Sequence, residues 1–352
     1  MSVLFRPRSH AERFNRSLAR MSMPELPTGL FLEALHQLVS LDRDWVPTSE
    51  GASLHLRPFM FATDTSLGAG RPSRTYLFVV IASPSAPYFG VEPRAISVWL
   101  SDRYVRAAAG GTGAAKTGGN YAGALLGLQE AAHHSCDQAV WLDAAERRNV
   151  EEAGAMNLFF VLRSAESVRL VTPALTGTFL AGVTRASILE IAPQLGLQIS
   201  EEQVSVDDVA SWSETGELTE VFACGTAAIV AGIGRIKSAA LNLVVGQGGE
   251  GVVTGGLRTL LSGIRRGLEP DPFGWIEPVV AASLTTCRSA RAGRADTSAV
   301  AACLVEYRGQ DLPGLQDVCL HQRPRSGGIP GDHRCDDRVV MAQVGLVQVI
   351  GS

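Results

Sequence analysis

The sequence predicts an α+β protein made of two domains, and three observations support this prediction. The chain has 352 residues, which is enough for two ordinary domains. Hydrophobic residues make up 46% of the chain and charged residues 19%, a composition typical of globular proteins that bury a sizeable core. Strand and helix patterns both recur along the chain, and they are interrupted by a cluster of breakers at Pro84, Pro87 and Gly90.

Residues 1–84 are predicted to form the first domain, a small one that mixes helices and strands and opens with a short strand. The motif from Ser9 to Glu12 has the form of a capping box, which predicts a helix that carries Arg13 in its first turn. The periodicity of apolar residues predicts one more helix and two strands, over 31–39, 53–61 and 74–82. Residues 85–94 are interpreted as an interdomain linker.

Residues 95–277 are predicted to form the larger domain, in which glycine-rich turns alternate with strands and helices. The expected strands lie at 139–142, 158–162, 169–172 and 220–223, and the expected helices at 121–133, 184–195 and 253–266. Two turns in this domain have the features of anion sites. The segment Gly182 to Arg185 precedes a helix whose first N–H groups point outward, and Thr226 offers a hydroxyl in a turn after a strand.

Lys116 is the first candidate for chemistry, because it lies alone among small residues in the glycine-rich segment 110–121. Three interpretations are open from the residues alone. The segment matches a phosphate-binding P-loop except that Ala115 replaces the glycine before the lysine, with Asp143 as a candidate magnesium ligand. Lys116 also fits a lysine that binds a cofactor aldehyde as a Schiff base. The third interpretation is a solvated surface lysine.

The composition argues against several classes of partner. The formal net charge is −4, and no basic stripe interleaved with aromatic residues is present, so we expect no nucleic acid partner. No apolar run reaches the roughly 20 residues that span a bilayer, so we expect no membrane role. The N-terminal residues lack a secretory apolar region, which favours a cytoplasmic location. A small metabolite is the expected ligand.

Residues 278–352 differ in composition from the rest of the chain and are expected to form an unrelated, disordered tail. Four of the six cysteines lie there, at Cys287, Cys303, Cys319 and Cys335. Their spacing with neighbouring histidines matches none of the usual structural zinc patterns, so no metal site is predicted.

Several uncommon motifs occur in a consistent order along the chain. They are Lys116 with Gly118 to Tyr121, Trp141 to Asp143, Glu151 to Asn157, Gly182 to Arg185, and Cys224 to Ala227. Together they resemble the branched-chain aminotransferases, which are pyridoxal-phosphate enzymes of fold type IV. The resemblance runs from about residue 4 to about residue 276. It implies a fold with a partial small N-terminal α/β domain and a larger C-terminal domain.

The resemblance also implies roles for particular residues. Lys116 matches the lysine that joins the cofactor aldehyde and moves the substrate's α-proton. Glu152 matches the carboxylate beside the pyridine nitrogen, and Tyr121 the phenol that bonds the ring oxygen. The residues expected to bind pyridoxal 5'-phosphate are Arg13, Lys116, Tyr121, Glu152, Val183, Thr184 and Thr226. The residues expected to contact substrate are His55, Arg57, Tyr88 and Ala227, with His55 where the family usually has tyrosine.

The implied reaction transfers the amino group of leucine, isoleucine or valine to 2-oxoglutarate in branched-chain amino acid biosynthesis. The implied assembly is a homodimer, because the family places its active sites near a subunit interface. The first residues match a strand that lies well inside the family's small domain, so we expect part of that domain to be absent. This expectation supports an alternative, in which the chain is a degenerate homologue that binds the cofactor but transaminates little or not at all. A P-loop nucleotide-binding protein is the third interpretation.

Overall fold

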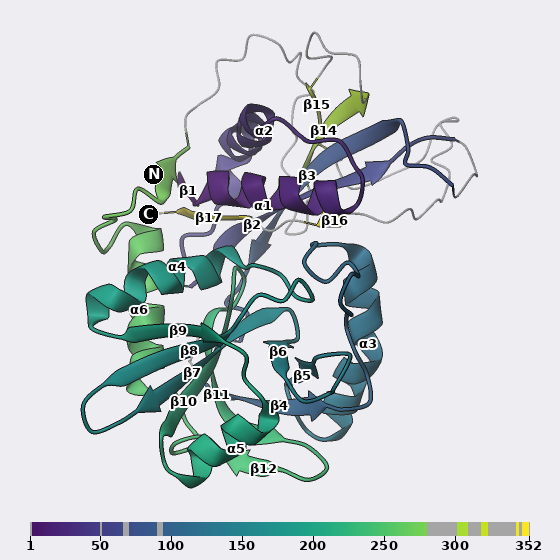
Figure 1. The fold of residues 1–352 in the computed structure, drawn as a ribbon. Helices are drawn as coiled ribbons and strands as arrows, with labels where there is room; N and C mark the ends of the chain where they lie inside the picture. Colours follow the sequence, from purple (N-terminus) through teal and green to yellow (C-terminus); the bar gives the residue numbers. More distant parts are fainter. Residues whose placement is uncertain are drawn as a thin grey trace. The chain divides into compact units, whose positions relative to one another are not determined.

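The computed structural model describes residues 2–49, 51–65, 70–89 and 94–279, together with the backbone of four short strands after residue 300. The chain divides into two compact units (Figure 1). The first consists of Met1–Ser85 and Gly274–Ser352, and the second is Ala86–Phe273. The segment 278–352, which composition set apart as a tail, is therefore grouped with the first unit. Whether it is foreign to the rest of the chain stays a prediction.

The first unit contains two helices and a sheet whose described strand pairs are antiparallel. Its elements are β1 (Ser2–Phe5), α1 (Pro7–Arg20), α2 (Thr28–Leu41), a 3-10 turn (Arg43–Trp45), β2 (Ser53–Ala62), β3 (Thr75–Ser85), β13 (Ile276–Pro278), β14 (Ala301–Arg308), β15 (Val318–Gln322), β16 (Gln343–Val344) and β17 (Val347–Gly351). The sheet order is β13-β1-β17-β2-β3-β14-β15, with β16 also paired to β2. Strands from the C-terminal segment therefore pair with strands from the N-terminal one.

Three aromatic rings join the helices of the first unit to its sheet. Phe14 of α1 lies 5.6 Å from Phe31 of α2 and 5.7 Å from Phe78 of β3, measured between ring centroids. All three rings are buried. Burial of such rings is the main source of stability in a small mixed domain.

Helix α1 begins earlier than the capping-box motif predicted. It starts at Pro7, with Arg6 as the residue before it, and no side chain caps this end among the described residues. Proline is favoured at the first helical position because its missing N–H would have no partner there. The Ser9 to Glu12 motif therefore lies inside the helix, and Arg13 lies in its second turn rather than its first.

The second unit contains a larger sheet flanked by helices. Its elements are β4 (Ile96–Ser101), α3 (Gly118–His133), β5 (Gln138–Leu142), β6 (Val150–Ala153), β7 (Met156–Arg163), β8 (Val168–Pro173), α4 (Val183–Ile191), a 3-10 turn (Ala192–Leu195), β9 (Gln198–Glu202), α5 (Val206–Glu214), β10 (Leu218–Gly225), β11 (Ile229–Lys237), β12 (Asn242–Val244) and α6 (Val252–Arg266). The strands and helices predicted between residues 95 and 277 all lie within elements of this unit.

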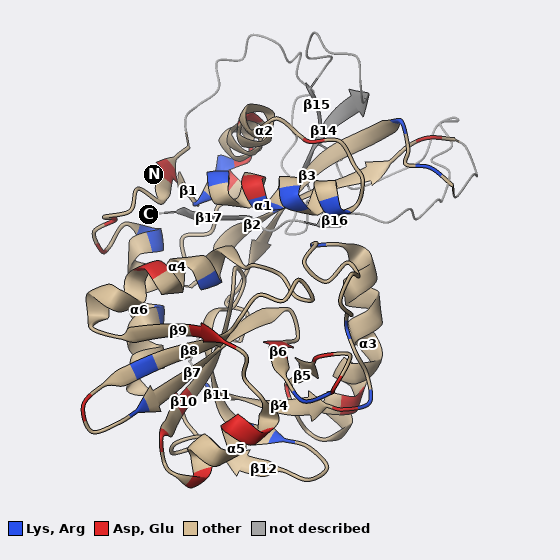
Figure 2. Ribbon diagram, viewed as in Figure 1, with Lys and Arg blue, Asp and Glu red and all other residues tan. Residues whose placement is uncertain are grey.

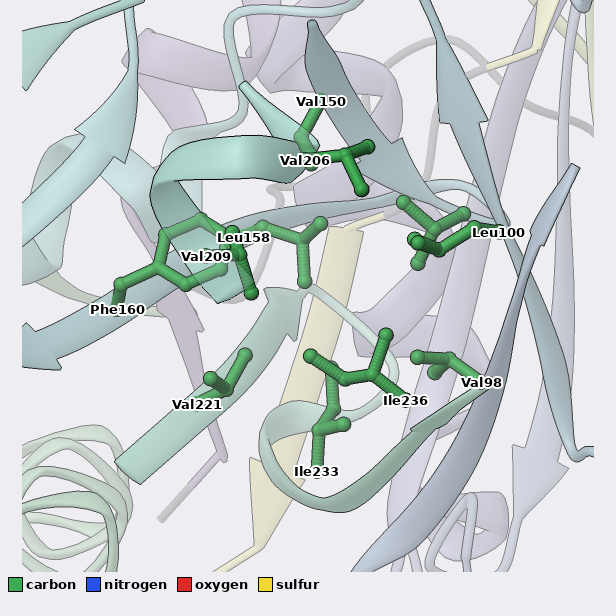
Figure 3. A pocket seen from close by; sticks show the side chains of 11 residues that line it. Val98, Leu100, Val150, Leu158, Phe160, Val206, Val209, Val221, Ile233 and Ile236 are labelled. Atoms are coloured by element: carbon green, nitrogen blue, oxygen red, sulfur yellow. The ribbon is translucent and has the colours of Figure 1, made fainter. Parts of the chain in front are cut away.

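Six strands of the second unit close into a ring. The order is β10-β11-β4-β5-β6-β7, and β7 pairs again with β10. A pocket inside the ring, bordered by its strands and by α5, is lined by apolar side chains (Figure 3), as expected for a small closed sheet whose interior is filled by side chains. The lining residues are Val98, Leu100, Val140, Val150, Leu158, Phe160, Val206, Val209, Val221, Ile233 and Ile236. This pocket therefore offers no polar side chain for chemistry.

Within the described part of the chain, none of the helices combines the length and the apolar character that a bilayer crossing requires.

Candidate active site

Lys116 lies at the end of the loop that leads into α3, and its amine faces the first turn of that helix. The Lys116 Nζ donates a hydrogen bond of 2.6 Å to the Tyr121 hydroxyl, and it lies 5.3 Å from the centre of the same ring. Tyr121 is 40% exposed, and Lys116 is half-buried. The amine is therefore held in a defined place and remains accessible to a ligand.

Asn120 fixes the loop that presents Lys116. Its Nδ2 donates to the carbonyl oxygens of Thr112 and Ala115, each at 2.8 Å, and its Oδ1 accepts from the Thr112 hydroxyl at 2.8 Å. Asn120 is buried, so these bonds are shielded from water. The loop thus depends on a side chain that follows it, at the start of α3.

Glu152 provides a buried carboxyl group close to Lys116. It lies on β6 and is 3% exposed. Burial raises its pKa to about 7, although the positive charges of Arg106 and Lys116 oppose this rise. The Arg106 Nε lies 2.6 Å from Glu152 Oε1, and both side chains are nearly inaccessible. A carboxyl group with such a pKa in a charged site is typical of functional sites.

The strand register places residues of two sequence-distant motifs side by side. Glu152 of β6 is paired with Asn157 of β7, and Asn157 is paired with Cys224 of β10. Residues directly opposite one another on neighbouring strands point to the same face of a sheet. This row leads to the turn after β10, where Thr226 and Ala227 are half-buried.

Asn157 connects this row to the N-terminus of α4. Its Nδ2 donates to the Leu180 carbonyl at 2.9 Å. A Cβ atom on Gly182 would lie 2.3 Å from the Asn157 Oδ1, so only glycine permits this approach. Val183 and Thr184 open the helix, and among the described residues no side chain caps it. Its first N–H groups therefore form a candidate anion site.

Arg185, in the first turn of α4, bonds this end of the helix to neighbouring strands. Its Nη2 lies 2.6 Å from the Glu201 Oε2 and donates to the Pro173 carbonyl at 3.2 Å. Glu201 and Glu202 form the acidic end of β9, which is drawn in red in Figure 2. The helix is thus tied to the sheet by a charge pair at its first turn.

Asp143 is a structural turn residue. Its carboxylate accepts backbone N–H bonds from Glu146, Arg148 and Asn149, at 2.7, 3.0 and 2.7 Å. Burial would raise the pKa of Asp143, but these amides outweigh it and lower the pKa to about 2. These contacts occupy the carboxylate that the P-loop interpretation reserved for magnesium. Across the described residues, no group of three or more His, Cys, Asp or Glu side chains is arranged to hold a metal ion.

The remaining predicted residues belong partly to the first unit and partly to the second. Arg13 is buried on α1 of the first unit, with Nη2 3.3 Å from His10 Nδ1. His55 and Arg57 lie on one face of β2 in the same unit, half-buried and exposed respectively. Tyr88 belongs to the second unit, where it is 56% exposed and packs edge-on against Phe89. The roles of these four residues stay predictions.

Sequence reasoning missed Arg106, Asn120 and Asn157 as individual contributors. Asn120 and Asn157 lie inside motifs that carried the resemblance, which could have drawn attention to them. Arg106 lies in a loop outside these motifs, and its importance depends on contacts with distant segments.

The chemical groups of this site fit pyridoxal 5'-phosphate. The cofactor offers an aldehyde, a pyridine nitrogen and a phosphate. The second unit offers an accessible amine at Lys116, a buried carboxyl group at Glu152 and a helix N-terminus at Val183 and Thr184. The Tyr121 hydroxyl beside the amine provides a further hydrogen-bonding group.

Comparisons with known proteins agree with this geometry. Residues 2–237 match the family model described as amino-transferase class IV. The branched-chain-amino-acid aminotransferase of Mycobacterium tuberculosis is 48% identical over 277 residues, which cover 78% of this chain and 74% of that protein. The branched-chain-amino-acid transaminase 1 of Bacillus subtilis is 45% identical over 274 residues, covering 78% of this chain and 76% of that protein.

Solved structures give the same result. The Escherichia coli branched-chain amino acid aminotransferase superposes with a TM-score of 0.67 at 29% identity, over 79% of this chain and 85% of that one. The T.th. branched-chain amino acid aminotransferase, solved with pyridoxamine 5'-phosphate, gives a TM-score of 0.65 at 26% identity, over 80% of this chain and 88% of that one.

Proposed function

The chain belongs to the amino-transferase class IV family, and from this premise we propose that it is a branched-chain-amino-acid aminotransferase that uses pyridoxal 5'-phosphate. Its amino donors are leucine, isoleucine and valine. We propose 2-oxoglutarate as the amino acceptor. The observation that carries the proposal is the Lys116 amine, bonded to Tyr121 and influenced by the charge of the buried Glu152.

When bound, the cofactor supplies an electron sink for the negative charge that remains on the substrate α-carbon after its proton leaves. Lys116 has two tasks in this proposal. Its Nζ would bind the cofactor aldehyde until the substrate amine displaces it, and the freed amine would then take the proton from the substrate α-carbon and deliver it to the carbon of that aldehyde. Tyr121 supports both tasks, because its hydroxyl accepts a hydrogen bond from the amine and so fixes the position of Nζ.

Glu152 is assigned to the cofactor's pyridine nitrogen. An ionised carboxylate in a buried place stabilises a proton on a neighbouring ring nitrogen, because the charge interaction is weakly screened there. Val183 and Thr184 are assigned to the phosphate through backbone N–H groups and a hydroxyl, and Thr226 is assigned to the same phosphate. Arg13 is proposed as a further phosphate ligand on the basis of the resemblance alone.

The substrate assignments rest on the same resemblance. We propose that His55, Arg57, Tyr88 and Ala227 contact the substrate. We also propose a homodimer and a cytoplasmic location. A sedimentation or light-scattering measurement that returned a strict monomer for the cofactor-loaded protein would contradict the assembly.

Turnover with two amino donors tests the proposed function. The cofactor-loaded protein should transaminate L-leucine with 2-oxoglutarate and produce glutamate, with D-alanine as the comparison donor. A preference for D-alanine would assign the chain to a different substrate class of the same family. Tight cofactor binding without turnover on either donor would support the degenerate homologue instead.

A further inference from the structure

Arg106 lies in the segment between β4 and α3, and it contacts three parts of the second unit at once. Its Nη2 donates to the carbonyl oxygen of Thr178 at 2.9 Å and, over a longer 3.4 Å, to that of Gly113. Its Nε lies 2.6 Å from Glu152 Oε1. The Arg106 side chain is only 8% exposed, so these contacts form in a poorly hydrated place.

The two carbonyl oxygens belong to segments that touch directly. Ala114 donates its backbone N–H to the Gly177 carbonyl at 3.1 Å. A Cβ atom on Gly113 would overlap the Thr178 carbonyl, at a separation of 1.9 Å. The loop that presents Lys116 is therefore packed onto residues 177–178, and Arg106 bonds to both sides of this contact.

Two buried carboxyl groups interact with the charge of Arg106. Glu151 and Glu152 are both buried, and Thr178 donates its hydroxyl to Glu151. The positive groups that act on Glu152 are Arg106 and Lys116, and the negative one is Glu151. Glu151 also interacts with the charge of Asp143. The positive charge of the Arg106 guanidinium does not depend on whether the Lys116 amine is occupied by a cofactor.

We propose that Arg106 is a positioning residue for transamination, which favours the ionised form of Glu152, holds this carboxyl group in place for the cofactor's ring nitrogen and ties the Lys116 loop to residues 177–178. This inference rests on the proposed function. The physical reason is a competition for one proton. A guanidinium beside Glu152 lowers the proton affinity of this carboxylate, so the proton stays on the ring nitrogen, where the electron sink requires it.

The test separates the charge of Arg106 from its hydrogen bonds. Arg106→Met removes both, whereas Arg106→Lys keeps the charge but cannot reach all three partners with one ammonium group. Arg103→Met is the matched control, because Arg103 is an exposed arginine of the same loop that packs over Tyr104. All measurements use the cofactor-free full chain first, so that they do not depend on cofactor binding.

Two readouts are needed. The first is the titration of the Glu152 carboxyl group by carbon-13 NMR, with the signal assigned by its loss in Glu152→Gln. Arg106→Met should move the midpoint upward by about one pH unit or more, while Arg106→Lys leaves it close to that of the parent chain. The second is hydrogen exchange of the Ala114 amide, which should become about tenfold faster in both Arg106 variants. Arg103→Met should change neither.

An unchanged Glu152 midpoint in folded Arg106→Met, or unchanged Ala114 exchange in Arg106→Lys, would overturn the inference. If Arg106→Met does not fold, the Ala114 exchange of Arg106→Lys decides the outcome alone. Failure of the proposed function would be seen separately, as a parent chain that binds no pyridoxal 5'-phosphate while its Glu152 titration still responds to Arg106.

Discussion

At the scale of single residues, the site depends on one carboxyl group that is buried despite its charge. Glu152 has a pKa raised from an ordinary 4.5 to about 7, chiefly by burial. A raised carboxyl pKa means that the folded chain binds a proton more tightly than the unfolded chain. The related stability is therefore fully present below about pH 4.5 and is lost as the pH rises through about 7.

Glu152→Gln should remove this pH dependence. Between pH 4 and pH 8 the Glu152 contribution in the cofactor-free chain falls by roughly 3 kcal/mol, and the variant should lack this loss. Denaturant unfolding at both pH values measures the difference, with exposed Glu166→Gln as the control. Equal pH profiles for the parent chain and Glu152→Gln would show that burial does not raise the pKa of the Glu152 carboxyl group. The same variant should also lose most turnover.

Asn157 should matter for cofactor affinity more than for folding. Asn157→Ala removes the donor to the Leu180 carbonyl and the contact with Gly182, so the N-terminus of α4 loses its connection to the sheet. We expect weaker pyridoxal 5'-phosphate binding, by about tenfold, and a stability loss of about 1 to 3 kcal/mol. Equilibrium binding and thermal unfolding check this, with exposed Asn242→Ala as the control. Unaltered affinity would exclude the assigned role of the helix end.

The residue types of Lys116, Tyr121 and Glu152 were identifiable from their motifs. In the structure the lysine amine donates a hydrogen bond to Tyr121, and its charge lowers the pKa of Glu152. Arg106 was not identifiable. An arginine in a loop is usually a solvated charge, and no spacing rule indicates that its partners are carbonyl groups of distant segments. The role inferred for Arg106 depends on contacts with segments that are distant in the sequence, and no local pattern indicates such contacts.

At the scale of elements, the helices with a long apolar pattern and several strands were predicted, whereas α5, β6 and β11 were missed. The helices α3 and α6 match their predicted ranges closely, because each has an apolar pattern over several turns. Strand β6 was missed because it has four residues and two of them are glutamates. Helix α1 was predicted to begin at a capping box, whereas the proline at Pro7 provides its start.

The contact between the lysine loop and residues 177–178 gives an element-scale prediction. Gly113→Ala should disrupt this contact, because the new Cβ atom would overlap backbone atoms of Thr178 that cannot move independently. We expect a stability loss above about 2 kcal/mol and reduced cofactor occupancy. Gly256→Ala on α6 is the control, since no atom lies within 4 Å of its Cβ position. Equal midpoints of thermal unfolding for Gly113→Ala and Gly256→Ala would contradict this packing.

At the scale of the whole molecule, the sequence predicted a boundary near residue 85 and a second one near residue 277. The structure divides the chain after Ser85 and after Phe273. The C-terminal strands pair with β1, β2 and β3, and such pairing between the two ends of a chain leaves no local signal in composition. For this reason the sequence predicted that residues 278–352 form an unrelated tail.

The central claim is that Lys116 holds pyridoxal 5'-phosphate in a transaminase, and the most direct measurement combines absorbance with chemical trapping. The loaded protein should absorb in the violet, lose this band when L-leucine is added and recover it with 2-oxoglutarate. Borohydride should fix the cofactor to the peptide that contains Lys116, and Lys116→Ala should abolish both signals. Lys237→Ala, which alters a half-buried lysine whose amine donates to the His134 carbonyl, should leave them unchanged. A protein that stays colourless with the cofactor, or that is labelled at a lysine other than Lys116, would contradict the account.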